Sequence, residues 1–117
     1  MRAILLASIC CLFSMSAHAE SSAREMLQAY DKGTLKGKAS ITEHMRLIEM
    51  GMAYANASLK NDHQNPLYCT PEQPVLTGQL LVEIVRQQLE KAPAAGNVDV
   101  GAVMMAALKR VFPCSAN

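Results

Sequence analysis

The sequence predicts an all-α fold: a small four-helix domain whose C-terminal helical hairpin is clasped by one disulfide. Three observations lead to this fold class. In four segments the apolar residues recur three and four positions apart, which is the spacing of one face of a helix. Each segment follows a residue that commonly caps a helix, and the proline-rich stretch at 66–74 shows no strand alternation. Two cysteines, Cys69 and Cys114, flank the last two segments.

Residues 1–19 are predicted to be a signal peptide that is cleaved on export. Arg2 supplies a positive start, residues 3–15 are apolar apart from two serines, and Ala-His-Ala at 17–19 has small residues where signal peptidase reads. A membrane anchor is the alternative, but the apolar run is shorter than the roughly 20 residues that span a bilayer. A lipoprotein signal is also less favoured. The mature chain, residues 20–117, is too short for two ordinary domains.

The charge balance of the mature chain argues against two classes of partner. Removal of Arg2 leaves 10 basic and 10 acidic side chains from the 11 and 10 of the full sequence, so the mature chain is nearly neutral. It has neither a basic stripe for nucleic acid nor a polybasic face for anionic lipid. Tryptophan is absent and aromatic residues make up 4% of the chain, which leaves little for stacking on bases. We expect no nucleic-acid partner and no membrane contact after cleavage.

The first helix is expected to start at Ser22. Ser22 is a good N-cap, and Glu25 three residues later can close a capping box. Gly33 is a natural stop, and residues 33–39 are expected to form a short Gly/Lys linker. The buried face is expected to consist of Ala23, Met26, Leu27 and Tyr30.

The second helix is expected to start at Ser40, with Glu43 as its reciprocal cap, and to fray into residues 60–66. Gly51 and Ala55 lie on adjoining turns and would let another backbone approach closely. A helix that is apolar on more than one side is covered on more than one side, so we expect two packed flanks. The main stripe comprises Ile41, Met45, Ile48, Met52, Ala55 and Leu59, and the second flank comprises Leu47, Met50 and Tyr54.

The third and fourth helices are expected to form the C-terminal hairpin. Thr77 caps the third helix, which Pro93 and Gly96 end, and Asp99 caps the fourth, which Phe-Pro-Cys at 112–114 stops. The inner face of the third helix comprises Leu80, Leu81, Ile84, Val85 and Leu89. The fourth helix keeps helical spacing through Val100, Val103, Met104, Ala107, Leu108 and Val111.

Cys69 and Cys114 are the only cysteines of the mature chain, and in an oxidising compartment they are predicted to form one disulfide. The alternative is a catalytic or metal-binding thiol, but neither cysteine lies in a C-x-x-C pair or beside a histidine at ligand spacing. A loop of about 45 residues closed by this bridge would stabilise the fold by about 4 kcal/mol. If the last two helices are antiparallel, the bridge clasps the hairpin shut.

The search for a catalytic set finds no supporting motif. The mature chain has two histidines, His44, which is expected in the first turn of the second helix, and His63 in a polar loop. No metalloprotease, phosphate-loop or nucleophile-elbow motif occurs, so we expect no enzyme, no metal and no cofactor.

The glycosylation sequon at 56–58 is interpreted as a chance match in a helix. Met50 and Met105 lie off their helical stripes and are the methionines best placed for an interaction surface.

Three motifs indicate a family. C-x-P begins at Cys69, T-x-Q-L begins at Thr77, and F-P-C closes the helical region at 112–114. With these motifs the chain resembles the Rap/Tai family of periplasmic immunity proteins, which act against amidase effectors of type VI secretion. The resemblance covers about half of the mature chain. Members often have an additional cysteine pair that links the first two helices, whereas the regions around Tyr30 and Met45 have none.

The resemblance implies an all-helical, non-catalytic homodimer that binds its cognate peptidoglycan amidase effector and blocks the active-site cleft. Two segments are candidates for the residues that enter the cleft, one at 61–65 and one at 94–98. The candidate partner-binding residues are Asn61, Asp62, His63, Gln64, Asn65, Ala95, Gly96 and Asn97. The alternatives are a small periplasmic acid-stress chaperone and an envelope adaptor with a similar helical fold.

Overall fold

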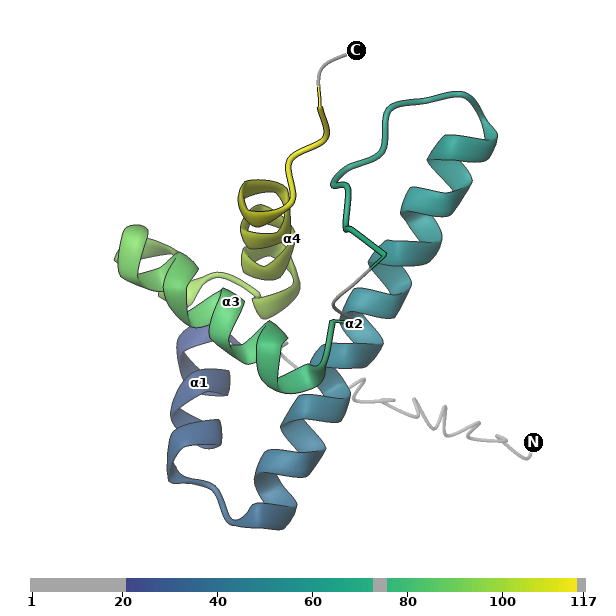
Figure 1. The fold of residues 1–117 in the computed structure, drawn as a ribbon. Coiled ribbons are helices and arrows are strands. Elements are labelled where there is room, and N and C mark those ends of the chain that lie inside the picture. The colour runs from purple at the N-terminus through teal and green to yellow at the C-terminus, as the bar shows by residue number, and fades with distance from the viewer. Residues whose placement is uncertain (1–20, 73–75, 116–117) are drawn as a thin grey trace, which may run out of the picture.

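The computed structural model describes residues 21–72 and 76–115, and the predicted signal peptide lies outside them. This part of the chain is helical, as predicted (Figure 1). Four α-helices follow one another, with a 3₁₀ turn between the last two. Their bounds are α1, Ala23–Lys32; α2, Leu35–Asn61; α3, Gly78–Lys91; η1, Pro93–Asn97; and α4, Val100–Val111.

The helices enclose one core, to which each of them contributes. In Figure 1, α1 and the first half of α2 form an antiparallel pair, α3 crosses the middle of the molecule, and α4 is drawn above α3. Accordingly, α3 packs extensively against both α2 and α4. The fully enclosed large side chains are Met45, Leu81, Val85, Met104 and Leu108. None of the helices within the described ranges combines the length and the apolarity needed to cross a membrane.

The start of α1 follows the sequence prediction. Ser22 caps the helix and accepts a hydrogen bond from the Glu25 N–H at 3.3 Å, while the Glu25 carboxylate accepts from the Ser22 N–H at 3.1 Å. This pair is the predicted capping box. The Ala23 N–H donates to the Val98 carbonyl at 2.9 Å, which ties the start of α1 to the approach to α4.

The predicted start of the second helix was wrong. α2 begins at Leu35 instead of Ser40, so residues 35–39 are helical and do not form a linker. The cap is Thr34, whose hydroxyl accepts from the Gly37 N–H at 3.2 Å. The cost of one glycine in the first turns, about 1 kcal/mol, is offset because lysine and alanine are good helix formers and Thr34 supplies a cap. As a result His44 lies well inside α2, and not in its first turn.

The last two helices keep their predicted caps and ends. The Thr77 hydroxyl accepts from Leu80 N–H at 3.2 Å, and the Asp99 carboxylate accepts from Ala102 N–H at 3.1 Å. α3 ends at Lys91 before the η1 turn, which begins at Pro93. Gly78 at the start of α3 is buried against the α2 backbone, where a Cβ atom would collide with Thr42. Glycine therefore sets how closely α3 approaches α2.

The predicted disulfide is present between Cys69 and Cys114, 45 positions apart, with the two Cα atoms at 4.9 Å. Beside it the Cys69 N–H donates to the Phe112 carbonyl at 2.8 Å. The bridge therefore ties the connection between α2 and α3 to the end of α4.

Candidate partner-binding surface

The end of α2 and the chain that returns from it form a projection, which we call the finger and define as residues 57–70. Figure 1 shows it beyond the body of the molecule, on the side away from α1. Its turn is closed by two hydrogen bonds, from His63 N–H to the Lys60 carbonyl at 3.1 Å and from Gln64 N–H to the Leu59 carbonyl at 2.8 Å. Paired bonds of this kind terminate many helices around a left-handed residue.

That left-handed residue is His63, with φ of 56°, and it is the only non-glycine residue with positive φ in the described ranges. Glycine usually occupies this position because a side chain there costs about 1 kcal/mol. The tip of the finger therefore carries the His63 side chain at a backbone position that glycine usually occupies.

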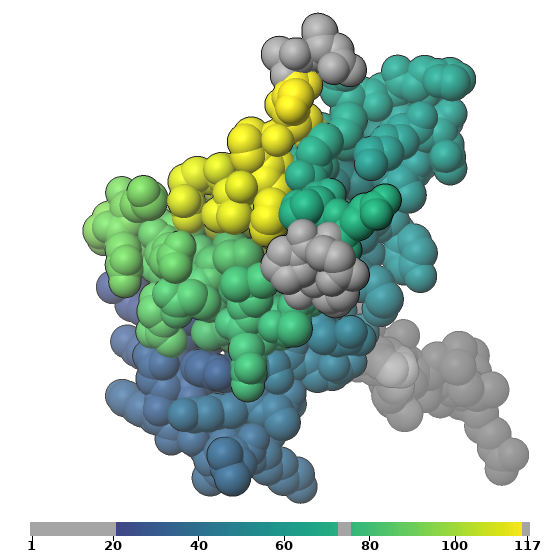
Figure 2. All heavy atoms as spheres, viewed as in Figure 1, coloured from purple at the N-terminus to yellow at the C-terminus, as the bar shows by residue number. Residues whose placement is uncertain are grey.

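The first candidate binding segment, residues 61–65, forms this tip. All five of its side chains are exposed, and they stand clear of the core at one extremity of the space-filling view (Figure 2). Three of the five are primary amides, Asn61, Gln64 and Asn65. Primary amides carry the same donor and acceptor pair as a peptide group, so the tip can form hydrogen bonds with a peptide-binding surface.

The second candidate segment lies differently. It forms η1, which packs against α1, and Gly96 is buried against the Arg24 guanidinium. Arg24 also donates to the Pro93 carbonyl at 2.8 Å. Ala95 is half-buried, whereas Asn97 remains exposed. The structure therefore sets Ala95 and Gly96 into the body of the molecule and leaves Asn97 on its surface.

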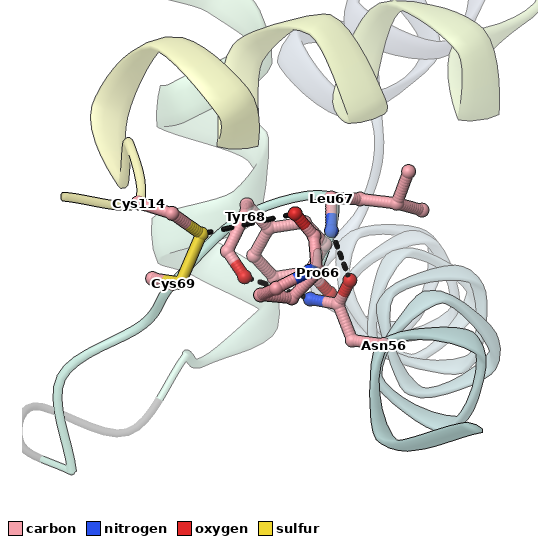
Figure 3. Close-up of a disulfide and its surroundings, with 6 residues drawn as sticks. All are labelled: Asn56, Pro66, Leu67, Tyr68, Cys69 and Cys114. Carbon is pink, nitrogen blue, oxygen red and sulfur yellow. Dashed lines mark hydrogen bonds between the residues drawn. A yellow bond between two sulfur atoms is a disulfide. The ribbon is translucent and has the colours of Figure 1, made fainter. Parts of the chain in front are cut away.

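The base of the finger is held by a polar contact that the sequence analysis did not anticipate. Asn56 on α2 is the one buried polar side chain in the described part of the chain, and it is 8% exposed. Its amide donates to the Tyr68 carbonyl at 2.9 Å and accepts from the Leu67 N–H at 2.7 Å (Figure 3). Both the nitrogen and the oxygen of the amide are thus engaged, which agrees with the interpretation of the sequon as a chance match.

Tyr68 anchors the returning chain next to Asn56. Its side chain is 2% exposed, and its hydroxyl donates to Glu49 at 3.2 Å. Burial, and secondarily the negative charge of Glu49, raises the pKa of the Tyr68 phenol. The disulfide follows at the next residue, so the returning chain is held at three consecutive positions: Leu67 and Tyr68 by hydrogen bonds, and Cys69 by a covalent bond.

A sequence signal for this contact exists. Asn56 lies four residues after Met52 and three before Leu59, so it falls on the same helical face as these two main-stripe residues, where an apolar residue is the norm. A polar residue at a stripe position indicates a buried hydrogen-bonding task, because burial without partners is costly.

The second flank of α2 is exposed, contrary to the expectation that both flanks are packed within the domain. Leu47, Met50 and Tyr54 are 50%, 39% and 71% exposed. A Cβ atom added at Gly51 would meet nothing within 4 Å. We call these four residues the α2 outer face. It leaves apolar surface uncovered in the middle of the longest helix, which is typical of a surface that meets another molecule.

A hollow of about 530 Å³ lies between α1 and α2, and its walls include Glu25, Ser40 and His44. Glu25 is already engaged in the α1 capping box. No hydrogen bond within the described residues joins His44 to Ser40 or to Glu25. No group of three or more potential metal ligands occurs in the same part of the chain.

A family model described as Rap1a immunity proteins matches residues 4–114. Comparisons with curated proteins and with solved structures found no significant match.

Proposed function

Because this chain belongs to the Rap1a immunity protein family, we propose that it protects its own cell by binding and inhibiting a peptidoglycan amidase delivered by type VI secretion. The inhibitor would act in the periplasm, after removal of residues 1–19, by occluding the active-site cleft of the amidase. The protein contributes binding and steric exclusion in this proposal, and no catalytic step. Family membership supports the immunity role, and the finger is the observation that supports occlusion.

The finger has the properties that such an inhibitor needs. An element that enters a cleft must project and must be stiff, because ordering a flexible loop on binding lowers affinity. Residues 61–65 project, and a closed turn and a disulfide-anchored return hold them. The three amide side chains at the tip suit a cleft whose substrate is a peptide, since they offer the same hydrogen-bonding groups. We therefore propose residues 61–65 as the contact segment in preference to 95–97.

We further propose that two copies associate through the α2 outer face. An antiparallel pairing of α2 with its copy across Gly51 would cover the exposed side chains of both copies. It would also bring the end that carries Glu43 and Arg46 near the end that carries Lys60 and Asp62. Each end has one acid and one base, so the pairing is self-complementary in charge. The two fingers would lie at opposite ends of the pair.

The proposal predicts that a peptidoglycan amidase is encoded beside this gene, and it is tested with that enzyme. Purified mature protein should abolish hydrolysis of peptidoglycan stem peptides at a stoichiometric amount. Full hydrolysis in the presence of excess protein would refute the immunity role.

Two charge insertions distinguish the two candidate segments. Gln64→Arg, at the finger tip, should weaken inhibition by roughly 10-fold or more, as expected when a charge must be desolvated in an interface. Asn97→Arg, which also adds a charge at an exposed position, should leave inhibition unchanged. The reverse pattern would transfer the contact to η1.

Association is tested in the same way. Tyr54→Lys should shift the mature protein toward monomer in sedimentation velocity, whereas Leu35→Lys, at an 89% exposed apolar residue on the same helix, should not. If the wild-type protein is monomeric at high concentration, the α2 outer face does not bind a second copy.

A further inference from the structure

We propose that Asn56 is a positioning residue for inhibition: its amide latches the returning chain onto α2 and so holds the finger in the conformation that enters the effector. This inference rests on the proposed function, because it assigns a role within the same binding element. Asn56 lies at the base of the finger, on the buried side of α2. It is therefore away from the tip that is proposed to contact the amidase.

The latch is chemically specific. Leu67 offers a backbone donor and Tyr68 a backbone acceptor, and a primary amide supplies the matching acceptor and donor at 2.7 and 2.9 Å. Figure 3 shows the Asn56 side chain directed at this stretch of backbone, beside the disulfide. Alanine would leave both backbone groups without these partners at a buried to half-buried site. A longer glutamine could not keep both contacts without displacing the chain.

The position of the latch explains why it would govern the finger. Beyond Asn56, the α2 residues Ala57, Ser58, Lys60 and Asn61 are all exposed, so the end of the helix is supported mainly by the chain that returns along it. A small hollow of about 170 Å³ lies between α2 and the returning chain, and its walls include Glu49 and Lys60. Loss of the latch would let the returning chain move toward this hollow, while the disulfide would keep only its far end in place.

Hydrogen exchange of the free protein tests the latch without any partner. In Asn56→Ala, the Leu67 amide should exchange about 10- to 100-fold faster, because it loses its acceptor, whereas amides within α3 should be unchanged. Unchanged exchange at Leu67 would overturn the proposal.

Asn56→Asp gives a chemical rescue. A protonated carboxyl group has one donor and one acceptor, as the amide has, whereas the carboxylate has acceptors only and would repel the Tyr68 carbonyl. Glu49, Lys60 and Tyr68 are the ionisable residues that line the adjacent hollow. The protection factor of Leu67 in this variant should therefore recover as the pH falls, and that of Asn56→Ala should not. Equal pH profiles for the two variants would contradict the latch.

Inhibition of the neighbouring amidase then tests positioning. Asn56→Ala should weaken inhibition about 10-fold or more, although in this proposal residue 56 does not touch the amidase. Leu27→Ala, a core truncation in α1 far from the finger, should keep the wild-type inhibition constant despite its lower stability. Equal inhibition by Asn56→Ala and wild type, with faster exchange at Leu67, would overturn the positioning role. Failure of the wild type itself to inhibit would instead refute the proposed function, and the exchange data would still decide the latch.

Discussion

Removal of the disulfide should cost this protein a large part of its stability. The bridge joins positions 45 apart, and the chain-entropy relation converts a loop of that length into about 4 kcal/mol of the free energy of unfolding. For a domain of about 100 residues, 1 kcal/mol corresponds to roughly 4–8 °C, so Tm should fall by about 15–30 °C. A small helical core makes such a loss severe, because domains of this size have a total stability of about 5–15 kcal/mol.

The assay is thermal unfolding of the mature protein followed by circular dichroism, with and without a reductant. The double variant Cys69→Ser/Cys114→Ser should melt at the temperature of the reduced wild type and should not respond to the reductant, which makes it the internal control. A decrease of less than about 5 °C in both cases would refute the reasoning, since it would mean that the bridge constrains an unfolded chain that is already compact.

The other predictions concern charge, burial and close packing. Asp31 forms two hydrogen bonds with Arg86 that lower the pKa of its carboxyl below 3.8, so stability should be lost as the pH falls through that lowered pKa, and Asp31→Asn should flatten this loss in acid denaturation curves. Tyr68 has a raised pKa, so the unfolded chain loses its proton first and stability should fall as the pH rises above 10.0. Tyr68→Phe should remove that alkaline loss, although it gives up the bond to Glu49. Gly78→Ala should destabilise the fold by about 1–3 kcal/mol in urea unfolding, because its methyl group meets the α2 backbone.

Each of these variants has a matched control in the same chain. Asp62→Asn changes an exposed acid that is in no ion pair within the described residues, and Tyr54→Phe changes a tyrosine that is 71% exposed. Gly37→Ala adds a methyl group at an ordinary 3.5 Å from Thr34 Oγ1 and should stabilise α2 by about 0.5–1 kcal/mol. A control that matched its test variant in sign and size would contradict the corresponding explanation.

The parts of the fold that could be predicted from the sequence are those with local causes. The capping box at Ser22, the caps at Thr77 and Asp99 and the stop at Pro93 each depend on a few neighbouring residues, and all of them are present. The disulfide could be predicted because the two cysteines of the predicted mature chain have one simple pairing in an oxidising compartment.

The start of α2 could not be predicted because two local signals competed. Ser40 with Glu43 resembles a capping box, and the glycines at 33 and 37 resemble a linker. Thr34 is an equally good cap, and the helical tendency of the lysines and alanine after it decides the outcome. Helix propensities that differ by a few tenths of a kcal/mol decide between a start at Leu35 and a start at Ser40, and the sequence pattern alone does not resolve such differences.

The candidate site was predicted only in outline for a different reason. Residues 61–65 are polar and follow a helix, which predicts an exposed connection, and they are exposed. The sequence gives no sign that His63 adopts a left-handed conformation, and the partner of Asn56 is a backbone 11 and 12 residues away. A contact from a side chain to distant backbone does not restrict the residue type that supplies the backbone, here Leu67 and Tyr68. Only the polar Asn56 on an apolar face of α2 indicates the contact.

Residues 20–117 contain no second cysteine pair, and this has a physical consequence for the N-terminal half of the domain. Polar contacts tie α1 to the rest of the domain: the Ala23 N–H to the Val98 carbonyl, Arg24 to the Pro93 carbonyl, and Asp31 to Arg86 at 2.7 Å. They reach η1, its C-terminal flank and α3, so a single broken contact leaves the helix in place.

Reduction of the disulfide should therefore affect the two parts of the domain unequally. The α1–α2 pair depends on no covalent bond, whereas the finger loses one of its three consecutive anchors, and the Asn56 latch then carries its conformation. The combination of Asn56→Ala with the cysteine variants should for that reason weaken inhibition by more than the product of the two separate effects, and simple multiplication would show that latch and bridge act independently.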